Sequence, residues 1–139
     1  MDGNPTIIQY AGDEFFIATT PSGHAQTVDV KGGRNAAAGP LELFLVGLGS
    51  CTAADVISIL HKKREKVTDY RVEIRSERRD EHPRAFRRIE LKHIVRGANL
   101  SAESVERAIA LSTEKYCSAI ATVRATAEIV TTFEIQADV

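Results

Sequence analysis

Two cysteines are the residues of this chain best suited to redox chemistry, and their surroundings differ. Cys51 lies in a nearly uncharged run, PLELFLVGLGSCTAADVISIL, directly after Gly49 and Ser50. Cys117 follows an amphipathic segment, in EKYCSAIATV. Small neighbours let a second sulfur or a substrate approach a thiol closely. If the fold brings the two thiols together they form a redox pair, and otherwise each is a small core residue.

The local sequence favours Cys117 as the more acidic thiol. It begins a short predicted helix, Cys117–Arg124, whose dipole favours a thiolate at its N-terminus, and Lys115 precedes it by two positions. Cys51 is predicted about three turns inside its helix, where a packed core cysteine and a reactive one are equally compatible with the sequence. The local residues therefore leave open which thiol would react first.

Metal and hydrolase chemistry have weaker support. The chain has four histidines: His24, His61, His82 and His93. They have no metal-ligand spacing with one another or with the cysteines, so we expect no metal and no other cofactor. We expect His93, on the buried face of a predicted hairpin, to be a core histidine with satisfied hydrogen bonds. Ser50 does not stand in a Gly-x-Ser-x-Gly motif, which disfavours a hydrolase.

The composition is that of one globular domain over residues 1–139. Hydrophobic residues make up 43% of the chain, and the net charge of -1 provides no basic field for nucleic acid. The first residues are polar, so we expect no export signal and a cytoplasmic protein. The uncharged run Leu43–Ala54 has 12 residues, fewer than the roughly 20 that a membrane span needs. We therefore expect neither nucleic acid nor a membrane as a partner.

Periodicity predicts an α+β domain with the element order βββ-α-ββ-α-α-β and an antiparallel sheet. Three short strands precede a long helix, which is followed by a hairpin, two helices and a last strand. The predicted strands are Ile7–Tyr10, Phe15–Thr19, Gln26–Val30, Asp69–Arg78, Arg88–Arg96 and Glu128–Phe133 with Ile135. The predicted helices are Pro40–Arg64, a helix capped by Ser101 that reaches Lys115, and Cys117–Arg124.

The long helix Pro40–Arg64 has no polar stripe between Leu41 and Leu60. A helix that is apolar on all sides must be covered on all sides. One sheet covers only one side, and the simplest source of the remaining cover is a second copy of the chain. We therefore expect a homodimer with this long buried central helix near its two-fold axis.

Four segments carry a family resemblance: PLELFLVGLGSC, the following DVISIL, SERRDEHPRAF and RAIALSTEKYCSAIATV. Together they resemble the OsmC/Ohr family of small thiol proteins, in particular its branch of uncharacterised bacterial OsmC-like proteins. The resemblance extends from about Pro40 to the C-terminus. It implies an OsmC-like fold in an intertwined homodimer, with sites at the subunit interface. The implied activity is that of a thiol peroxidase, which reduces organic hydroperoxides and is recharged by a dithiol reductant.

The resemblance also implies a role for each cysteine. Cys51 would attack the peroxide and become a sulfenic acid, and Cys117 would resolve it to a disulfide that a cellular dithiol then reduces. These roles are the reverse of what the helix dipole suggests. We adopt the family roles, because an arginine from a partner chain could activate Cys51.

Family members also hold the thiolate and the peroxide with an arginine and a glutamate. Their glutamate directly follows the proline that opens the helix, where this chain has Leu41, and Glu42 comes one residue later, about 100° further around the helix. Their arginine lies in the N-terminal hairpin, which has none here. The candidates are Arg34 in the glycine-rich loop and Arg78, or its neighbour Arg79, at the end of the second hairpin.

Two other functions stay open at this point. One is a non-catalytic module whose interface pocket holds a small apolar ligand, with the cysteines as lining. The other is a redox sensor in which a disulfide alters contact with a partner. The displaced glutamate and arginine positions favour the binding module, whereas a sensor would be better supported by a charged tail or an extra domain. The distance between the two sulfurs is the observation that discriminates best.

Overall fold

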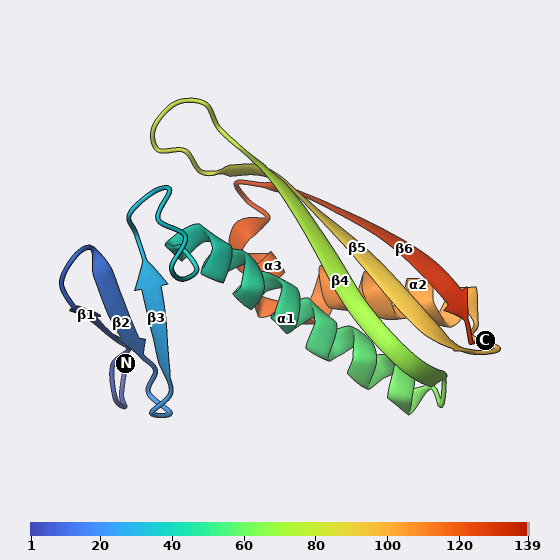
Figure 1. The fold of residues 1–139 in the computed structure, drawn as a ribbon. Helices are drawn as coiled ribbons and strands as arrows, with labels where there is room; N and C mark the ends of the chain where they lie inside the picture. Colours follow the sequence, from blue (N-terminus) through green and yellow to red (C-terminus); the bar gives the residue numbers. More distant parts are fainter. Residues whose placement is uncertain (139) are drawn as a thin grey trace. The chain divides into compact units, whose positions relative to one another are not determined.

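The computed structural model describes residues 1–138 and divides into two compact units, Met1–Val46 and Gly47–Val139. Its elements follow the predicted order (Figure 1). The strands are β1 (Ile7–Tyr10), β2 (Phe15–Thr19), β3 (Ala25–Asp29), β4 (Lys66–Arg78), β5 (Phe86–Ala98) and β6 (Glu128–Ala137). The helices are α1 (Pro40–Lys62), α2 (Ala102–Leu111), the π-helix η1 (Ser112–Tyr116) and α3 (Ser118–Val123).

The N-terminal unit is an antiparallel sheet with the strand order β1-β2-β3. Ile7 pairs with Thr19, and Phe15 pairs with Asp29. The turn between β1 and β2 requires three successive residues in the left-handed region, with Gly12 at φ 87° followed by Asp13 and Glu14. Glycine and aspartate tolerate that conformation better than most residues. This turn therefore separates the first two predicted strands.

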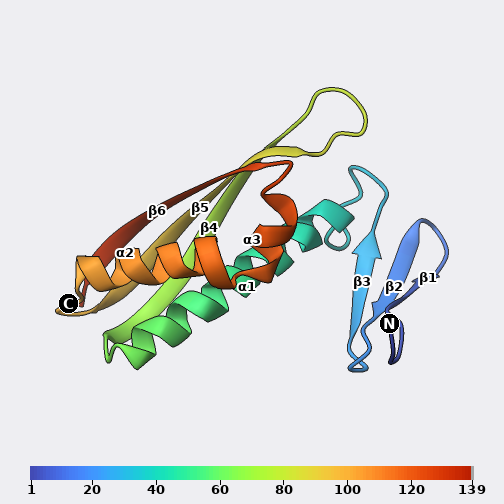
Figure 2. The ribbon, with the colours of Figure 1, turned by 180° about the vertical axis from the view of Figure 1, so that it is seen from behind.

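The larger unit carries the sheet β4-β5-β6, with its helices on one face of that sheet (Figures 1 and 2). β4 and β5 form a long antiparallel hairpin, and β6 runs parallel to β5. The parallel pairing follows from the connection, because α2, η1 and α3 carry the chain back along the sheet before β6 begins. The N-cap of α2 is as predicted, since the Ser101 hydroxyl accepts a hydrogen bond from the Ser104 N–H at 3.2 Å.

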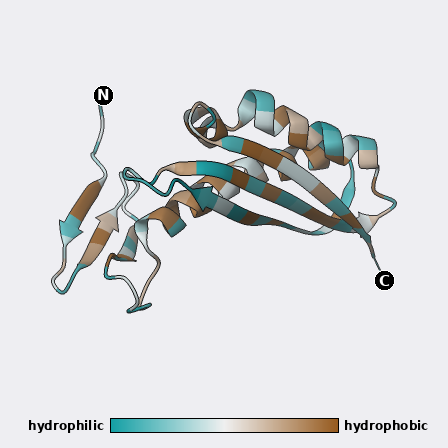
Figure 3. Ribbon diagram, turned by 90° about the horizontal axis from the view of Figure 1, so that it is seen from above, coloured by the Kyte–Doolittle hydropathy of each residue, from teal (hydrophilic) through white to brown (hydrophobic). Residues whose placement is uncertain are grey.

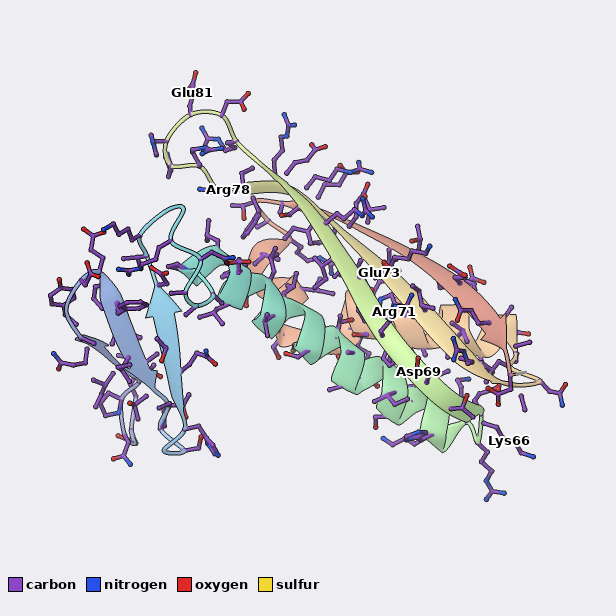
Figure 4. The ribbon with its side chains drawn as sticks, in the orientation of Figure 1. Lys66, Asp69, Arg71, Glu73, Arg78 and Glu81 are labelled. Atoms are coloured by element: carbon purple, nitrogen blue, oxygen red, sulfur yellow. The ribbon has the colours of Figure 1, made fainter. Side chains whose placement is uncertain are left out.

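The core of the larger unit lies between its sheet and its helices. Ile89, Leu91, His93 and Val95 on β5 are fully buried, and Ile94 between the last two is buried as well. The opposite face is charged, and Arg71 and Glu73 extend from β4 in Figure 4, while hydrophobic and hydrophilic positions alternate along the strands in Figure 3. A central apolar cluster joins α1, β5 and α2: Val56, Leu60, Val95, Val105, Ala108 and Ile109.

The long helix α1 is only partly covered by its own chain. Leu41, Phe44 and Val46 are exposed by 38%, 43% and 62%. Among the described residues, α1 is the one helix long and apolar enough to cross a membrane, and 28% of its most apolar window is buried inside the chain. Core helices of soluble proteins have the same length and composition, so the finding is weak support for a membrane span.

Two features of the predicted fold are wrong. The sequence predicted one antiparallel sheet, but residues 1–138 form two separate three-stranded sheets, and β6 joins the second in parallel. The helix predicted to reach Lys115 ends as an α-helix at Leu111 and continues as η1. Pairing partners and direction depend on how a chain is routed in space, and the hydrophobic pattern of a strand does not record them. A single domain over residues 1–139 stays a prediction.

Candidate thiol site

Cys51 lies in the middle of α1, in the part of that helix that belongs to the larger unit. Its thiol is free and partly exposed. Gly49, two residues earlier, allows β4 to pass close to the helix, because a Cβ at this position would collide with the Ile74 side chain. The small residues that precede Cys51 thus let the helix approach the sheet, and Cys51 itself is partly exposed.

Cys117 lies between η1 and α3. Its N–H donates to the Ser112 carbonyl at 2.8 Å, which closes the π-turn. Its sulfur accepts the Ile120 N–H at 3.4 Å and so caps α3. The side chain is 3% exposed. A π-turn adds a residue to the helix, and such turns occur frequently at functional sites.

The fold brings the two thiols together. Burial raises the pKa of the Cys117 thiol most strongly, the Ile120 N–H lowers it, and a hydrogen bond with the Cys51 thiol raises it again. The helix-dipole prediction of an acidic Cys117 is therefore wrong, because the cost of burying a thiolate outweighs the N–H groups of a helix of only six residues. The pair consists of one partly exposed and one buried free thiol.

A chain of polar side chains lies beside the thiols. The Thr52 and Ser112 hydroxyl oxygens are 2.7 Å apart, and both residues are fully buried. The Ser112 hydroxyl also lies 2.9 Å from Oδ2 of Asp55. The sequence singled out none of these three residues. The one signal for Ser112 is a polar residue at an apolar position of the helix predicted to begin after Ser101.

Arg34 lies in the N-terminal unit, where carboxylates occupy its guanidinium. Its Nη2 donates to Oδ1 of Asp29 at 2.8 Å, and its Nη1 donates to Oδ2 of Asp13 at 2.8 Å. Its Cζ lies 3.8 Å from the centre of the Phe15 ring. The hydrogen bonds from Arg34 lower the pKa of Asp29 to about 2. These contacts bind the glycine-rich loop to the N-terminal sheet.

Glu42 and Arg78 also have local partners. Oε1 of Glu42 accepts the Gly39 N–H at 3.0 Å, as a capping residue at the start of α1 does. Arg78 lies at the end of β4, beside the hairpin loop that carries Glu81 (Figure 4). Its Nε donates to the Arg84 carbonyl at 2.8 Å. A role for Arg34, Glu42 or Arg78 at the thiols stays a prediction.

His93 is buried as predicted, but its hydrogen bonding is incomplete. Its Nδ1 lies 2.7 Å from the Tyr70 hydroxyl. Its Nε2 is buried and has no hydrogen-bond partner within residues 1–138. Burial lowers the pKa of His93 to about 4, and burial together with the charge of Asp55 raises the pKa of Tyr70. The prediction of a satisfied core histidine is thus half correct.

An open groove of about 530 Å³ follows α1 and β4 in the larger unit. Ser50, Ala53, Ala54 and Ile57 line it from α1, and Val67, Thr68, Asp69 and Tyr70 line it from β4. Ser50 and Ala53 flank the position of Cys51 in the sequence. Within residues 1–138, no group of three or more His, Cys, Asp or Glu side chains could hold a metal ion.

Comparison with known proteins identifies the family to which this fold belongs. Residues 32–132 match the family of OsmC-like proteins. The chain belongs to that family. It is similar to protein YhfA of Escherichia coli K12, with 41% identity over 88% of this chain and 90% of YhfA. The OsmC/Ohr resemblance stated from the sequence is confirmed.

Solved structures share the mixed α+β fold. A hypothetical protein from Aquifex aeolicus VF5 has a TM-score of 0.86 and 32% identity, and the match covers 100% of both chains. An organic hydroperoxide resistance protein OsmC from Legionella pneumophila has a TM-score of 0.67 and 16% identity, over 94% of this chain and 97% of that one. The second likeness, at low identity, concerns the fold alone.

Proposed function

We propose that this OsmC-like protein reduces organic hydroperoxides with Cys51 as the attacking thiol and Cys117 as the resolving thiol. The observation that carries the proposal is that two free thiols of unequal burial lie close enough for Cys51 to raise the pKa of Cys117. A peroxide can reach only a thiol that is open to solvent, whereas a resolving thiol needs only its neighbour. The partly exposed Cys51 suits the first role, and the buried Cys117 suits the second.

Each turnover reduces one peroxide molecule and oxidises one dithiol molecule. The Cys51 thiolate attacks the distal oxygen, the O–O bond breaks, and the alkoxide takes a proton and leaves as an alcohol. Sulfur is oxidised by two electrons to a sulfenic acid. The Cys117 thiol then displaces the hydroxyl, which leaves as water, and the disulfide forms. An external dithiol returns both cysteines to thiols and becomes a disulfide itself. Burial raises the pKa of the Cys117 thiol.

We further propose that the working form is a homodimer in the cytoplasm. The exposed apolar side chains Leu41, Phe44 and Val46 on α1 support association with a second copy. A reducing compartment would keep the two cysteines as free thiols between turnovers. The arginine that activates Cys51 would then come from either subunit, with Arg34 and Arg78 as the candidates. Analytical ultracentrifugation at micromolar concentration tests the dimer, and a stable 15.2 kDa species would contradict it.

The activity is tested with tert-butyl or cumene hydroperoxide and excess dithiol. The wild-type protein should consume peroxide faster than the free dithiol does, and Cys51→Ser should abolish the difference, because an alcohol does not replace a thiolate at neutral pH. Cys117→Ser should still react once and leave a Cys51 sulfenic acid that dimedone traps. Each variant serves as the control for the other.

The outcomes separate the possible roles. Loss of the first step in Cys117→Ser but not in Cys51→Ser would reverse the two roles. Unchanged peroxide consumption in both variants would show that the thiols are structural. A protein that forms the disulfide in a redox buffer but has no peroxidase activity would fit a redox sensor.

A second candidate function is the binding of a small apolar ligand without catalysis. The groove between α1 and β4, lined largely by alanine, isoleucine, valine and tyrosine side chains, favours it. The occupied guanidinium of Arg34 favours it as well, since that side chain already has carboxylate partners. An Ala53→Trp substitution would fill the groove. Loss of binding of a fluorescent fatty acid or a similar apolar probe, with peroxidase activity absent throughout, would support this function.

A further inference from the structure

Ser112 connects the two helical segments that carry the thiols. Its carbonyl oxygen accepts the Cys117 N–H at 2.8 Å, and its side chain contacts α1 at both Thr52 and Asp55. Thr52 is the residue after Cys51, and Asp55 lies one helical turn beyond Cys51 on the same face. A single fully buried residue thus links the backbone of Cys117 to the immediate neighbours of Cys51.

The direction of these hydrogen bonds follows from what each group can do. A carboxylate only accepts, so the Ser112 hydroxyl donates its one proton to Asp55. The Ser112 oxygen is then free to accept, and the Thr52 hydroxyl donates to it. The order of donation is Thr52 to Ser112 to Asp55. A hydrogen bond that ends on a carboxylate is stronger than one between neutral groups, so donation toward Asp55 is the preferred order.

The π-turn makes the position of Cys117 depend on Ser112. In an α-helix the Ser112 carbonyl would accept the N–H of the residue four positions later, whereas here it accepts the N–H of Cys117, five positions later. The extra residue turns the backbone so that Cys117 leaves the helix in an extended conformation, with φ −73° and ψ 106°. The hydrogen bonds of the Ser112 side chain fix this irregular turn against α1.

We propose that Ser112 is a positioning residue that holds Cys117 beside Cys51 through the Thr52–Ser112–Asp55 chain. For catalysis the inference rests on the proposed function, since the step it assists is the attack of the Cys117 thiol on the Cys51 sulfenic acid. In that step an S–S bond forms, the S–O bond breaks, and water leaves. Two thiols held together behave as reagents at high effective concentration, which favours the disulfide over the open dithiol.

The first test measures the reduction potential of the Cys51–Cys117 disulfide, which needs no peroxide. The full-length protein is equilibrated with dithiothreitol redox buffers, and the oxidised fraction is counted by thiol alkylation and mass spectrometry. Ser112→Ala and Thr52→Val should each lower the equilibrium constant for disulfide formation by about tenfold, which corresponds to a potential about 30 mV less negative. Thr52→Val conserves shape, so it provides the result if Ser112→Ala folds poorly.

Two matched variants control this test. Thr113 is the next residue of η1, and its hydroxyl donates to the Ile109 carbonyl at 2.8 Å within its own helix. Thr113→Val therefore removes a hydroxyl from the same turn without touching α1 and should leave the potential unchanged. Thr52→Ser keeps the hydroxyl and should retain the wild-type potential. Equal potentials in the wild type, Ser112→Ala and Thr52→Val would overturn the proposal, as would an equal shift in Thr113→Val.

The second test follows the fate of the sulfenic acid after one equivalent of tert-butyl hydroperoxide. In Ser112→Ala, Cys51 should be oxidised at the wild-type rate. A larger share of the Cys51 sulfenic acid should then be trapped by dimedone or proceed to sulfinic acid, because Cys117 attacks it more slowly. A general loss of stability would slow both steps together. If no variant reacts with peroxide, the proposed function fails, while the potentials still decide the role of Ser112.

Discussion

The two units of this protein are stabilised by different interactions. In the N-terminal unit, Val28 and Asp29 are the only buried residues within Met1–Val46, and the buried carboxylate is hydrogen-bonded to Arg34. In the larger unit, Leu60 and Val95 belong to a continuous apolar cluster between the helices and the sheet. Charge-assisted hydrogen bonds and strand pairing organise the first unit, and apolar burial organises the second.

This difference separates an arginine with a structural role from a thiol pair suited to chemistry. Arg34 binds two carboxylates and covers a phenylalanine ring, which are the contacts of a residue that orders a loop. Cys51 and Cys117 adjoin each other in a unit whose fold is already held by its apolar core. A reactive pair gains from such support, because its geometry does not depend on its own interactions.

The largest expected effect is on the free energy of unfolding. A core truncation in the larger unit should lower it far more than a surface truncation in the N-terminal unit. Leu60→Ala should lower the free energy of unfolding by about 2–5 kcal/mol, because it leaves a cavity at a fully buried position. Ile8→Ala, at a residue 60% exposed on β1, should change it by less than about 0.5 kcal/mol. Urea denaturation measures both values. A comparable loss in Ile8→Ala would mean that a second chain covers β1.

A pH effect should be specific to the larger unit. The pKa of His93 falls from 6.5 to about 4 on folding, because burial penalises the charged ring. Between these pH values the unfolded chain binds a proton that the native chain does not. The contribution of neutral His93 to stability is therefore complete above pH 6.5. As the pH falls toward 4, the free energy of unfolding decreases by about 3 kcal/mol.

The measurement compares urea unfolding of the wild type and His93→Leu from pH 7.5 to 4. The difference between their pH profiles should contain the His93 contribution, whereas Tyr70→Phe, which keeps the imidazole, should retain the wild-type slope in this window. Parallel profiles for wild type and His93→Leu would show that His93 titrates normally in the native state.

The smallest expected effect concerns the ion pair of the N-terminal unit. Arg34→Ala should make the β2 and β3 amides exchange with solvent several-fold faster and leave those of β5 unchanged, because Asp29 loses its main partner. Arg34→Lys keeps the charge but not the paired hydrogen bonds and should give an intermediate result. Hydrogen–deuterium exchange with mass spectrometry resolves the two regions. Faster exchange in β5 as well would contradict the division between the units.

Acid should affect the same ion pair in a different pH window from His93. The pKa of Asp29 is lowered from 3.8 to about 2 in the folded chain. Its contribution is therefore present above pH 3.8 and is lost as the pH falls toward 2. Exchange in β2 and β3 should accelerate within that window, after the His93 contribution has already disappeared.

The sequence by itself determined the element order, most of the helix and strand positions, and the family. Alternation placed Ile89, Leu91, His93 and Val95 on one buried face, and the run from Pro40 predicted α1 almost to its last residue. These features are local, because the period of a hydrophobic pattern follows from the geometry of a helix or strand. The two cysteines were also identifiable, since few residue types perform redox chemistry and the chain has only two of them.

Only the tertiary structure decided which strands pair, how acidic Cys117 is, and what holds it beside Cys51. The helix dipole predicted an acidic thiol, but burial by distant segments reversed the sign of the pKa shift. Ser112 stands far from Thr52 in the sequence, and no local pattern relates a hydroxyl in η1 to one in α1. Desolvation, hydrogen bonding and pairing direction depend on neighbours that the fold supplies from elsewhere in the chain, and therefore they cannot be read from the residues that they affect.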